Sequence, residues 1–149
     1  MFDTAGYATL FAASFLAATV VPFSSEALLS AMLCMGFDPV VTLTVATLGN
    51  WLGGMSSYAI GRLGKIETIE KWLRIKPERI ERFAGKVTRY GHWLALLAWA
   101  PAVGDVIAVS LGLFKASAVK TTWLMLLGKA GRYAVLGYLT LAIAENISQ

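Results

Sequence analysis

Apolar residues fill two long blocks of the chain, and a shorter charged block lies between them. In the first block, one apolar stretch covers 7–21 and stops at Pro22, a second covers 26–35, and a third covers 39–62. A proline lacks the backbone N–H that a helix interior needs, so the first two stretches predict short helices joined at a break. The third stretch predicts a single helix long enough to cross a bilayer.

Residues with capping chemistry mark the ends of these helices. Ser24 and Ser25 offer side-chain oxygens at the start of the second helix, which we expect to end near Gly36. Asp38 and Pro39 suit the N-cap and the first helical position of the third helix. Two short apolar helices joined at a proline are typical of a re-entrant hairpin, whose broken backbone must be covered by protein or water.

The charged block, from about 63 to 90, predicts two amphipathic helices, the second of which starts at Pro77. Their apolar faces hold Ile66, Ile69, Trp72 and Leu73 in the first helix and Ile80, Phe83 and Val87 in the second. Helices of this kind lie on a membrane surface. The alternative is a solvated linker, which the acids of the block favour.

The apolar pattern occurs twice, because a shift of 79 positions places the second block on the first without a gap. The matching positions are Pro22 with Pro101, Glu26 with Asp105 and Gly49 with Gly128. We therefore predict an internal duplication. Its second copy would contain short helices over 92–100 and 106–114 and a long helix that Ser117 caps and that ends near Glu145.

The composition indicates that the chain is a polytopic membrane protein. Hydrophobic residues make up 57% of its 149 residues, and 13 of its 22 charged residues fall between Arg62 and Arg89. Two nearly charge-free blocks of this length exceed what a soluble core of this size needs. The net charge of +4 comes from the one charged block, so we expect acidic lipid headgroups rather than nucleic acid as partners.

The chain lacks the residue sets that common enzymes and metal sites use. Cys34 and His92 are the only residues of their types, so no disulfide, metal cluster or Ser/His/Asp set is expected. We therefore expect neither an enzyme activity nor a metal or another cofactor.

The positions of the cations predict how the chain is oriented. The positive-inside rule places 62–90 in the cytoplasm together with Lys115 and Lys120, whereas the equivalent junction of the first copy holds Asp38 and no cation. The two hairpins would then enter from opposite faces, and an inverted repeat of this kind is typical of transporters. The expected single domain consists of repeat 1 over 7–62, a cytoplasmic linker over 63–90 and repeat 2 over 91–146.

Glu26 and Asp105 are the candidate proton-coupling residues. A carboxylate inside a membrane is costly and by default indicates a functional site or a proton relay. Two of them, at symmetric breaks in opposed hairpins, would converge near the midplane and exchange protons. The alternative is that each acid only caps the helix after its proline, and one residue can do both.

Lys129 and Arg132 lie three positions apart on one face of the last long helix. They would either pair with the two acids in a neutral buried cluster or bind an anionic substrate such as a phosphate, for which an arginine is well suited. Both interpretations remain open, because an alternating-access site could exchange one arrangement for the other.

Several short motifs together resemble the DedA superfamily, whose members carry the SNARE-associated or VTT domain, and within it the short bacterial YqaA-type branch. The resemblance covers about residues 10–140 and rests on Pro22 with Glu26, on Gly53, on Tyr58, Gly61 and Arg62 in a Tyr-x-x-Gly-Arg pattern, on Arg89-Tyr90-Gly91, and on Pro101 followed by Gly112. It implies a bacterial inner-membrane protein with two opposed re-entrant hairpins. It also implies lipid movement between leaflets, as in undecaprenyl phosphate recycling or phospholipid scrambling, with dependence on the proton motive force.

The same resemblance implies that the essential acids are Glu26 and Asp38, which makes Asp38 a rival to Asp105. The chain departs from the family in the second hairpin, where typical members have an arginine before and after the proline and this chain has Ala98 and Gly104. Headgroup binding by those arginines therefore does not transfer. Lys129 and Arg132 are our candidates for the missing charge.

The leading hypothesis is a proton-linked translocase for an anionic lipid. In this hypothesis Glu26, Asp105 and Asp38 couple transport to protons, and Lys129, Arg132 and Arg62 contact the phosphate. A second hypothesis is an exchanger of small ions or metabolites that uses the same carboxylates. A third is a membrane-assembly scaffold, in which the small-residue face at Gly49, Gly53, Ser57 and Gly61 docks a partner or a further copy of the chain.

Overall fold

The computed structural model describes residues 2–18, 25–64, 67, 71, 76–100 and 103–149, and every secondary structure element within them is helical. In chain order the elements are α1 (Phe2–Ala17), α2 (Ser25–Cys34), α3 (Pro39–Leu63), α5 (Pro77–Tyr90), the 3₁₀ helix η1 (Gly91–Trp99), α6 (Gly104–Leu113) and α7 (Ala118–Ile147). This confirms the all-α class. Pro22, Pro101 and the first amphipathic helix, with Ile66, Ile69, Trp72 and Leu73, lie outside the described residues.

Local chemistry explains where α2 ends and α3 begins. The chain turns at Gly36, whose φ of 87° lies in the left-handed region that glycine adopts without strain. The Asp38 carboxylate then accepts a hydrogen bond of 2.9 Å from the backbone N–H of Val41, and Pro39 occupies the first turn of α3. These contacts confirm the predicted helix start.

The helix bounds repeat with the same shift as the sequence. α2, moved by 79 positions, has the bounds of α6, and the start of α3 falls on the start of α7. The turn repeats too, because Lys115, the residue equivalent to Gly36, also has a positive φ, of 53°. Lys115 carries a Cβ, so this conformation costs energy that a glycine would avoid.

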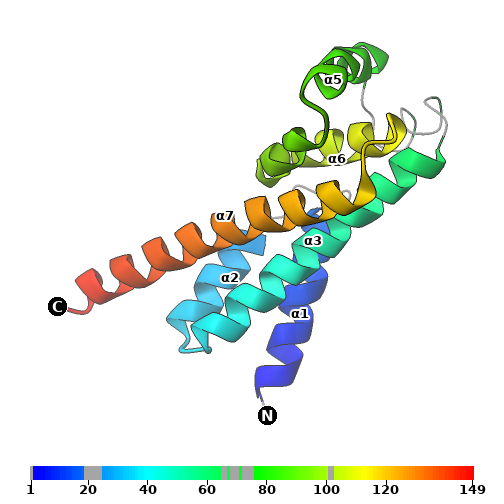
Figure 1. Cartoon of the computed structure of the whole chain (residues 1–149). Helices are drawn as coiled ribbons and strands as arrows, with labels where there is room; N and C mark the ends of the chain where they lie inside the picture. The colour runs from blue at the N-terminus through cyan, green and yellow to red at the C-terminus, as the bar shows by residue number, and fades with distance from the viewer. Residues whose placement is uncertain (1, 19–24, 65–66, 68–70, 72–75, 101–102) are drawn as a thin grey trace.

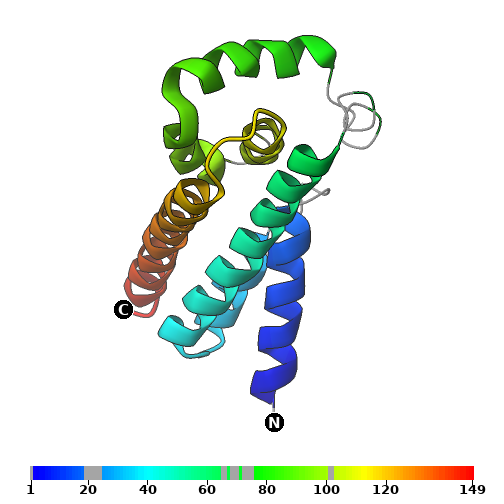
Figure 2. The same ribbon diagram turned by 45° about the vertical axis from the view of Figure 1, so that its right-hand side comes forward.

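α3 and α7 lie side by side and run antiparallel (Figure 1, Figure 2). The turn between α2 and α3 lies at one end of this pair, and the turn between α6 and α7 lies at the other end (Figure 1). Each short helix packs on the long helix of the other repeat, α2 on α7 and α6 on α3, whereas α1 packs on α3 and η1 packs on α7. The two repeats therefore point in opposite directions.

The segment before the second hairpin differs from the predicted helix over 92–100. It forms the nine-residue 3₁₀ helix η1, which begins at Gly91, where φ is 54°. A 3₁₀ helix rises about 2.0 Å per residue against about 1.5 Å for an α-helix, so this segment reaches roughly 18 Å with few residues. Leu94, Ala95 and Ala98 are buried on its inner side, and Trp93 is exposed.

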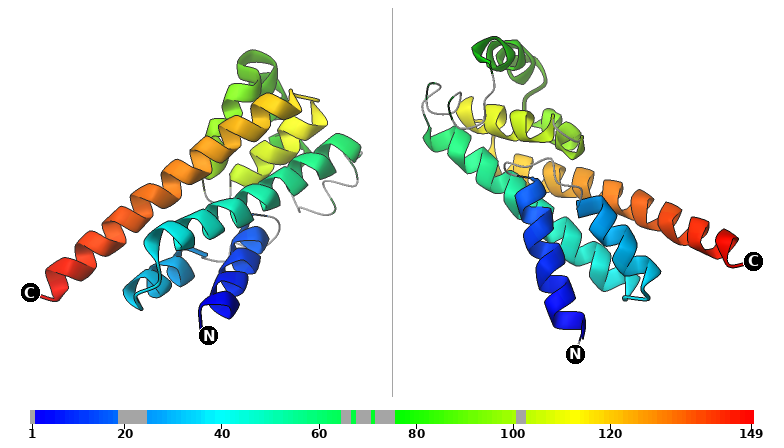
Figure 3. Two further views of the ribbon diagram at one scale, coloured as in Figure 1. Left: turned by 60° about the horizontal axis from the view of Figure 1, so that its bottom comes forward. Right: turned by 180° about the vertical axis from the view of Figure 1, so that it is seen from behind.

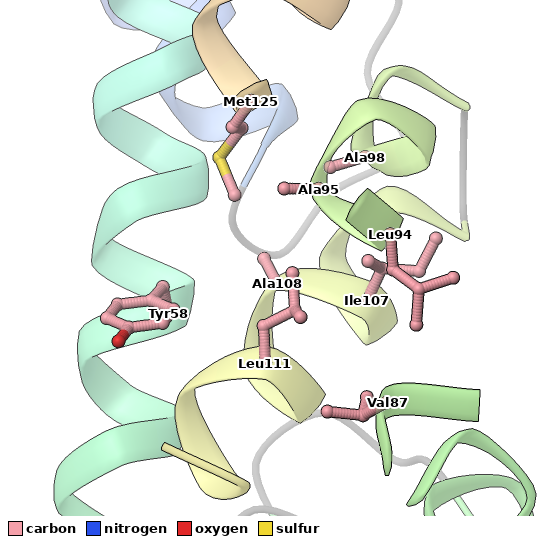
Figure 4. Packing of buried hydrophobic residues seen from close by; sticks show 9 residues of the cluster. All are labelled: Tyr58, Val87, Leu94, Ala95, Ala98, Ile107, Ala108, Leu111 and Met125. Carbon is pink, nitrogen blue, oxygen red and sulfur yellow. The ribbon is translucent and has the colours of Figure 1, made fainter. Parts of the chain in front are cut away.

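Two apolar clusters hold the helices together. The first contains Tyr58, Val87, Leu94, Ala95, Ala98, Ile107, Ala108, Leu111 and Met125 (Figure 4). It joins α3, α6, α7 and η1 to α5, which begins at Pro77 as predicted and lies at the same end of the molecule as the α6–α7 turn (Figure 3). The second contains Leu10, Leu29, Met32, Leu33, Ala46 and Tyr133. One core thus lies beside each hairpin.

The predicted membrane spans of α3 and α7 are not confirmed by the structure. We expected the helices over 39–62 and 117–145 to cross the bilayer, but among the described helices none combines the length and the apolarity that a membrane span needs. α7 carries four charged residues, and α3 carries threonines, serines and an asparagine along its length. Large apolar side chains, among them Leu48, Leu127, Ile60 and Leu139, are nevertheless exposed on their outer faces.

Candidate functional site

The buried faces of α3 and α7 are equivalent under the repeat. α7 buries Thr121, Met125, Lys129, Tyr133 and Gly137, and α3 buries the equivalent residues Thr42, Ala46, Asn50, Gly54 and Tyr58. Residues four apart on a helix share one face, so each set forms a single stripe. The stripes meet where α3 and α7 pack together, and this contact is the centre of the candidate site.

Lys129 lies at the centre of this contact. Its ammonium group donates a hydrogen bond to the side-chain oxygen of Asn50, which is the equivalent residue 79 positions earlier. A residue that contacts its own equivalent lies on the pseudo-two-fold axis between two repeats. The Lys129 residue is only 4% exposed, and the missing side chain at Gly54 leaves room for it, with Cε 3.1 Å from where a Cβ would stand.

Two further groups fix the surroundings of Lys129. The Asn50 amide nitrogen donates a hydrogen bond of 3.1 Å to the carbonyl oxygen of Ser14 on α1, which leaves the amide oxygen for Lys129. Asp105, in the first turn of α6, attracts Lys129 by its opposite charge. Acids in the first turn also interact favourably with the helix dipole.

Arg132 pairs with the acid of the other hairpin. Its guanidinium forms an ion pair with the carboxylate of Glu26 in the first turn of α2. A second guanidinium nitrogen donates a hydrogen bond of 2.8 Å to the carbonyl oxygen of Trp99, at the end of η1. The side chains of Arg132 and Glu26 are 19% and 37% exposed, so this pair is reachable from outside whereas Lys129 is not.

Hydroxyl groups extend the contact between α2 and α7. The Ser25 and Tyr133 hydroxyls lie 2.9 Å apart and are buried, and the Ser30 and Thr140 hydroxyls lie 3.1 Å apart. Together with the Glu26–Arg132 pair they form what we call the α2–α7 seam: Ser25, Glu26 and Ser30 on α2, and Arg132, Tyr133 and Thr140 on α7. Leu29, Met32 and Leu33 of α2 pack in one apolar cluster with Tyr133, so polar and apolar side chains alternate along this seam.

A motif at the end of α3 has a structural explanation. The Tyr58 hydroxyl donates a hydrogen bond of 2.6 Å to the carbonyl oxygen of Ala116 in the α6–α7 turn, and it accepts one of 2.8 Å from Arg62. Gly61 lies directly against the carbonyl oxygen of Val109 on α6. The Tyr-x-x-Gly-Arg pattern therefore ties α3 to the second hairpin.

Comparison with known proteins assigns the family. A model of the VTT domain matches residues 20–141. The chain belongs to the VTT-domain family. It is 37% identical over 133 residues to the inner membrane protein YqaA of Escherichia coli (strain K12) and to that of Shigella flexneri, with 89% of each chain covered. An uncharacterized protein of Haemophilus influenzae is 31% identical over 142 residues, which cover 88% of this chain and 85% of that protein.

These matches confirm the predicted DedA-type family and the location in the bacterial inner membrane. No solved structure matches the chain.

Two other predicted site residues of the VTT-domain chain, Asp38 and Arg62, lie away from the charged centre. Asp38 is exposed and caps α3. Arg62 is exposed and lies twelve residues beyond Asn50 in α3, about 18 Å along the helix axis. The predicted packing glycines contact neighbouring backbone: Gly49 and Gly53 face Phe11 and Phe15 on α1, Gly61 faces Val109 on α6, and Gly128 faces Leu96 on η1. Within the described residues, no group of three His, Cys, Asp or Glu side chains could hold a metal ion.

Sequence reasoning missed the uncharged members of the VTT-domain site. Asn50, Ser30 and Thr140 carry no charge and belong to no motif, so none of them stands out in the sequence. The repeat shift held a usable signal for Asn50, because it places this residue on Lys129. No comparable signal marks the hydroxyls, whose partners are set by the packing of α2 on α7.

Proposed function

We propose that this VTT-domain protein is a proton-linked translocase that moves an anionic lipid, such as undecaprenyl phosphate or a phospholipid, between the leaflets of the bacterial inner membrane. The observation that carries the proposal is the ion pair between the hairpin acid Glu26 and Arg132 of α7, close to the buried Lys129 on the same helix. Glu26 pairs with Arg132, and Asp105 attracts Lys129. Ionisable groups within a membrane protein's helices are expensive and usually functional.

The proposed cycle uses competition for Arg132. Protonation of Glu26 removes the negative charge that holds the guanidinium, which then binds a phosphate through two parallel hydrogen bonds. Loss of the proton restores the ion pair and displaces the phosphate. Asp105 and Lys129 would exchange partners in the same way in a second step, deeper in the protein. The two steps would then use hairpins that enter from opposite faces of the bilayer.

The test is leaflet exchange of labelled polyprenyl phosphate and labelled phospholipid in liposomes under a proton gradient. Wild-type protein is expected to exchange lipid, and Glu26→Gln combined with Asp105→Asn is expected to lose this exchange while remaining folded. The matched control is Glu81→Gln combined with Glu145→Gln, which also removes two negative charges but from exposed positions on α5 and α7. This control is expected to retain the wild-type rate.

Asp38→Asn separates the two roles open to Asp38. Asparagine caps a helix as well as aspartate does, so the start of α3 should be preserved. Loss of exchange in this variant would give Asp38 a proton-coupling role, and normal exchange would leave it a cap.

The other outcomes decide between functions. Proton flux without exchange of either lipid would replace the proposal with an ion exchanger. Absence of both activities from wild-type protein would favour the scaffold hypothesis. Lipid exchange at the wild-type rate in the Glu26→Gln and Asp105→Asn double variant would leave these two acids as helix caps.

A further inference from the structure

The two hairpins make equivalent contacts of different chemistry. In the α2–α7 seam, Ser30 and Thr140 are joined through their hydroxyls. The equivalent positions between α6 and α3 hold Val109 and Gly61, where the glycine lies directly against the valine carbonyl oxygen. The first contact is made by polar side chains and the second by backbone.

A second pair of equivalent positions, closer to Lys129, shows the same difference between polar side chains and backbone. Ser25 and Tyr133 share a buried hydrogen bond, whereas their equivalents, Gly104 and Gly54, have no side chains at all. Gly112 of α6 lies directly against the carbonyl oxygen of Tyr58, which closes the α3–α6 contact further. The duplicated interface thus has polar side chains at these positions in the first hairpin and none in the second.

The polar seam is continuous with the buried cation. Lys129, Tyr133 and Thr140 are separated by four and seven residues, so they share one face of α7 over roughly 16 Å. They lead from the pseudo-two-fold axis toward the end where α2 joins α3 (Figure 1). This track of polar side chains runs from the centre of the molecule toward one end and is interrupted by Leu136 and Gly137, between Tyr133 and Thr140.

The open edge of this track is apolar. Arg132 is partly exposed at the edge, and Leu139, seven residues later on the same face of α7, is 50% exposed. Ile143, one turn further, is 57% exposed. A polar interior beside an exposed apolar edge suits a molecule with a charged head and a hydrocarbon tail better than it suits a free ion.

We propose that the α2–α7 seam is the path of the lipid's phosphate headgroup between Lys129 and the α2–α3 end, with the tail outside against α7. This inference rests on the proposed function. Arg132 binds the phosphate first. As α2 then separates from α7, the phosphate loses its hydration water and accepts hydrogen bonds from the hydroxyls of Ser25, Tyr133, Ser30 and Thr140 instead. The α3–α6 contact carries no headgroup in this arrangement.

A reversible cross-link tests the path. In a Cys34→Ser background, Ser30→Cys with Thr140→Cys places two thiols where hydroxyls lie 3.1 Å apart, and oxidation should close the seam. The control is the single variant Thr140→Cys in the same background, which carries one thiol of the seam and cannot form the cross-link. Lipid exchange and release of trapped inorganic phosphate are measured in liposomes, oxidised and then reduced.

The expected result is that oxidation lowers lipid exchange through the seam pair to the rate of empty liposomes, that dithiothreitol restores it, and that the single-cysteine control keeps its rate. Exchange that continues through a fully cross-linked seam would overturn the path, as would equal loss in the control. Phosphate release that the seam cross-link blocks would make the ligand a free ion instead of a lipid.

A binding readout separates failure of the path from failure of transport. Polyprenyl phosphate is expected to slow alkylation of a Ser30→Cys thiol, while the uncharged polyprenol is expected not to. Protection without any transport would keep the seam as a phosphate-lipid site and remove the translocase function. Absence of protection would overturn the seam even if wild-type protein exchanges lipid.

Discussion

At the scale of single residues, the charged centre depends on groups that satisfy one another. Lys129 is buried against Asn50, and Arg132 is held by Glu26 and by the Trp99 carbonyl oxygen. The sequence singled out the four charged residues, because charge within an apolar block is rare. It could not show which acid meets which cation, since that pairing follows from the crossed packing of each hairpin on the opposite long helix.

Asn50→Leu should lower the free energy of unfolding by about 2 kcal/mol, because it leaves the Lys129 ammonium buried without its hydrogen-bond acceptor. Adding Lys129→Met to this variant should recover part of the loss, because it removes the unpaired ammonium, although Asp105 then loses the opposite charge that attracts it. Reversible denaturation of both variants in detergent gives the comparison. A double variant no more stable than Asn50→Leu would mean that the contact does not determine the stability of this region.

At the scale of elements, the sequence predicted the bounds of α2, α3, α5, α6 and α7 to within a few residues. Prolines, glycines and an N-cap aspartate mark these ends, and such signals act locally. The 3₁₀ geometry of η1 was not predicted, because nothing in Gly91–Trp99 distinguishes it from an apolar α-helix. Its geometry follows from its packing on α7 and α6.

The repeated turn gives a prediction at this scale. Lys115→Gly should raise the free energy of unfolding by about 1 kcal/mol relative to Lys115→Ala, because the left-handed backbone at this position strains any residue with a Cβ. Both substitutions remove the same charge, so the difference between their free energies of unfolding reports the cost of the backbone conformation alone. Equal stabilities in a denaturation experiment would contradict the positive φ at Lys115.

The glycines of α6 and α7 provide a matched pair. Gly112→Ala should destabilise the protein by about 2 kcal/mol, because its Cβ would overlap the Tyr58 carbonyl oxygen. Gly131→Ala meets open space and should be neutral or stabilising by up to about 1 kcal/mol. Thermal unfolding in detergent distinguishes them, and a Gly112→Ala protein as stable as Gly131→Ala would refute the close approach of α6 to α3.

At the scale of the whole molecule, the two ends of the α3–α7 pair differ in charge. Arg62, Lys115, Lys120 and the basic helix α5 lie at the end with the α6–α7 turn, and the α2–α3 turn with Asp38 lies at the other (Figure 1). The sequence predicted the duplication and this asymmetry from charge and spacing alone. The sequence did not predict that each short helix packs on the long helix of the other repeat, because no local sequence signal specifies a contact between segments so far apart in the chain.

This asymmetry predicts the sidedness of the protein. The native thiol of Cys34, exposed near the α2–α3 turn, should react with a membrane-impermeant maleimide added outside spheroplasts. A cysteine at Gly85 of α5, placed in the Cys34→Ser background, should react only after permeabilisation, since α5 is expected in the cytoplasm. The opposite labelling pattern would show that the protein has the opposite orientation in the membrane to the predicted one.

The central claim is that lipid movement is coupled to protons through Glu26, and collapse of the gradient tests it most directly. Exchange of labelled polyprenyl phosphate would be followed in liposomes before and after addition of a protonophore, with wild-type protein and with Glu26→Gln. The account predicts that the wild-type rate falls when the gradient collapses and that the variant is slow in both conditions. A wild-type rate that does not change on collapse of the gradient would contradict it.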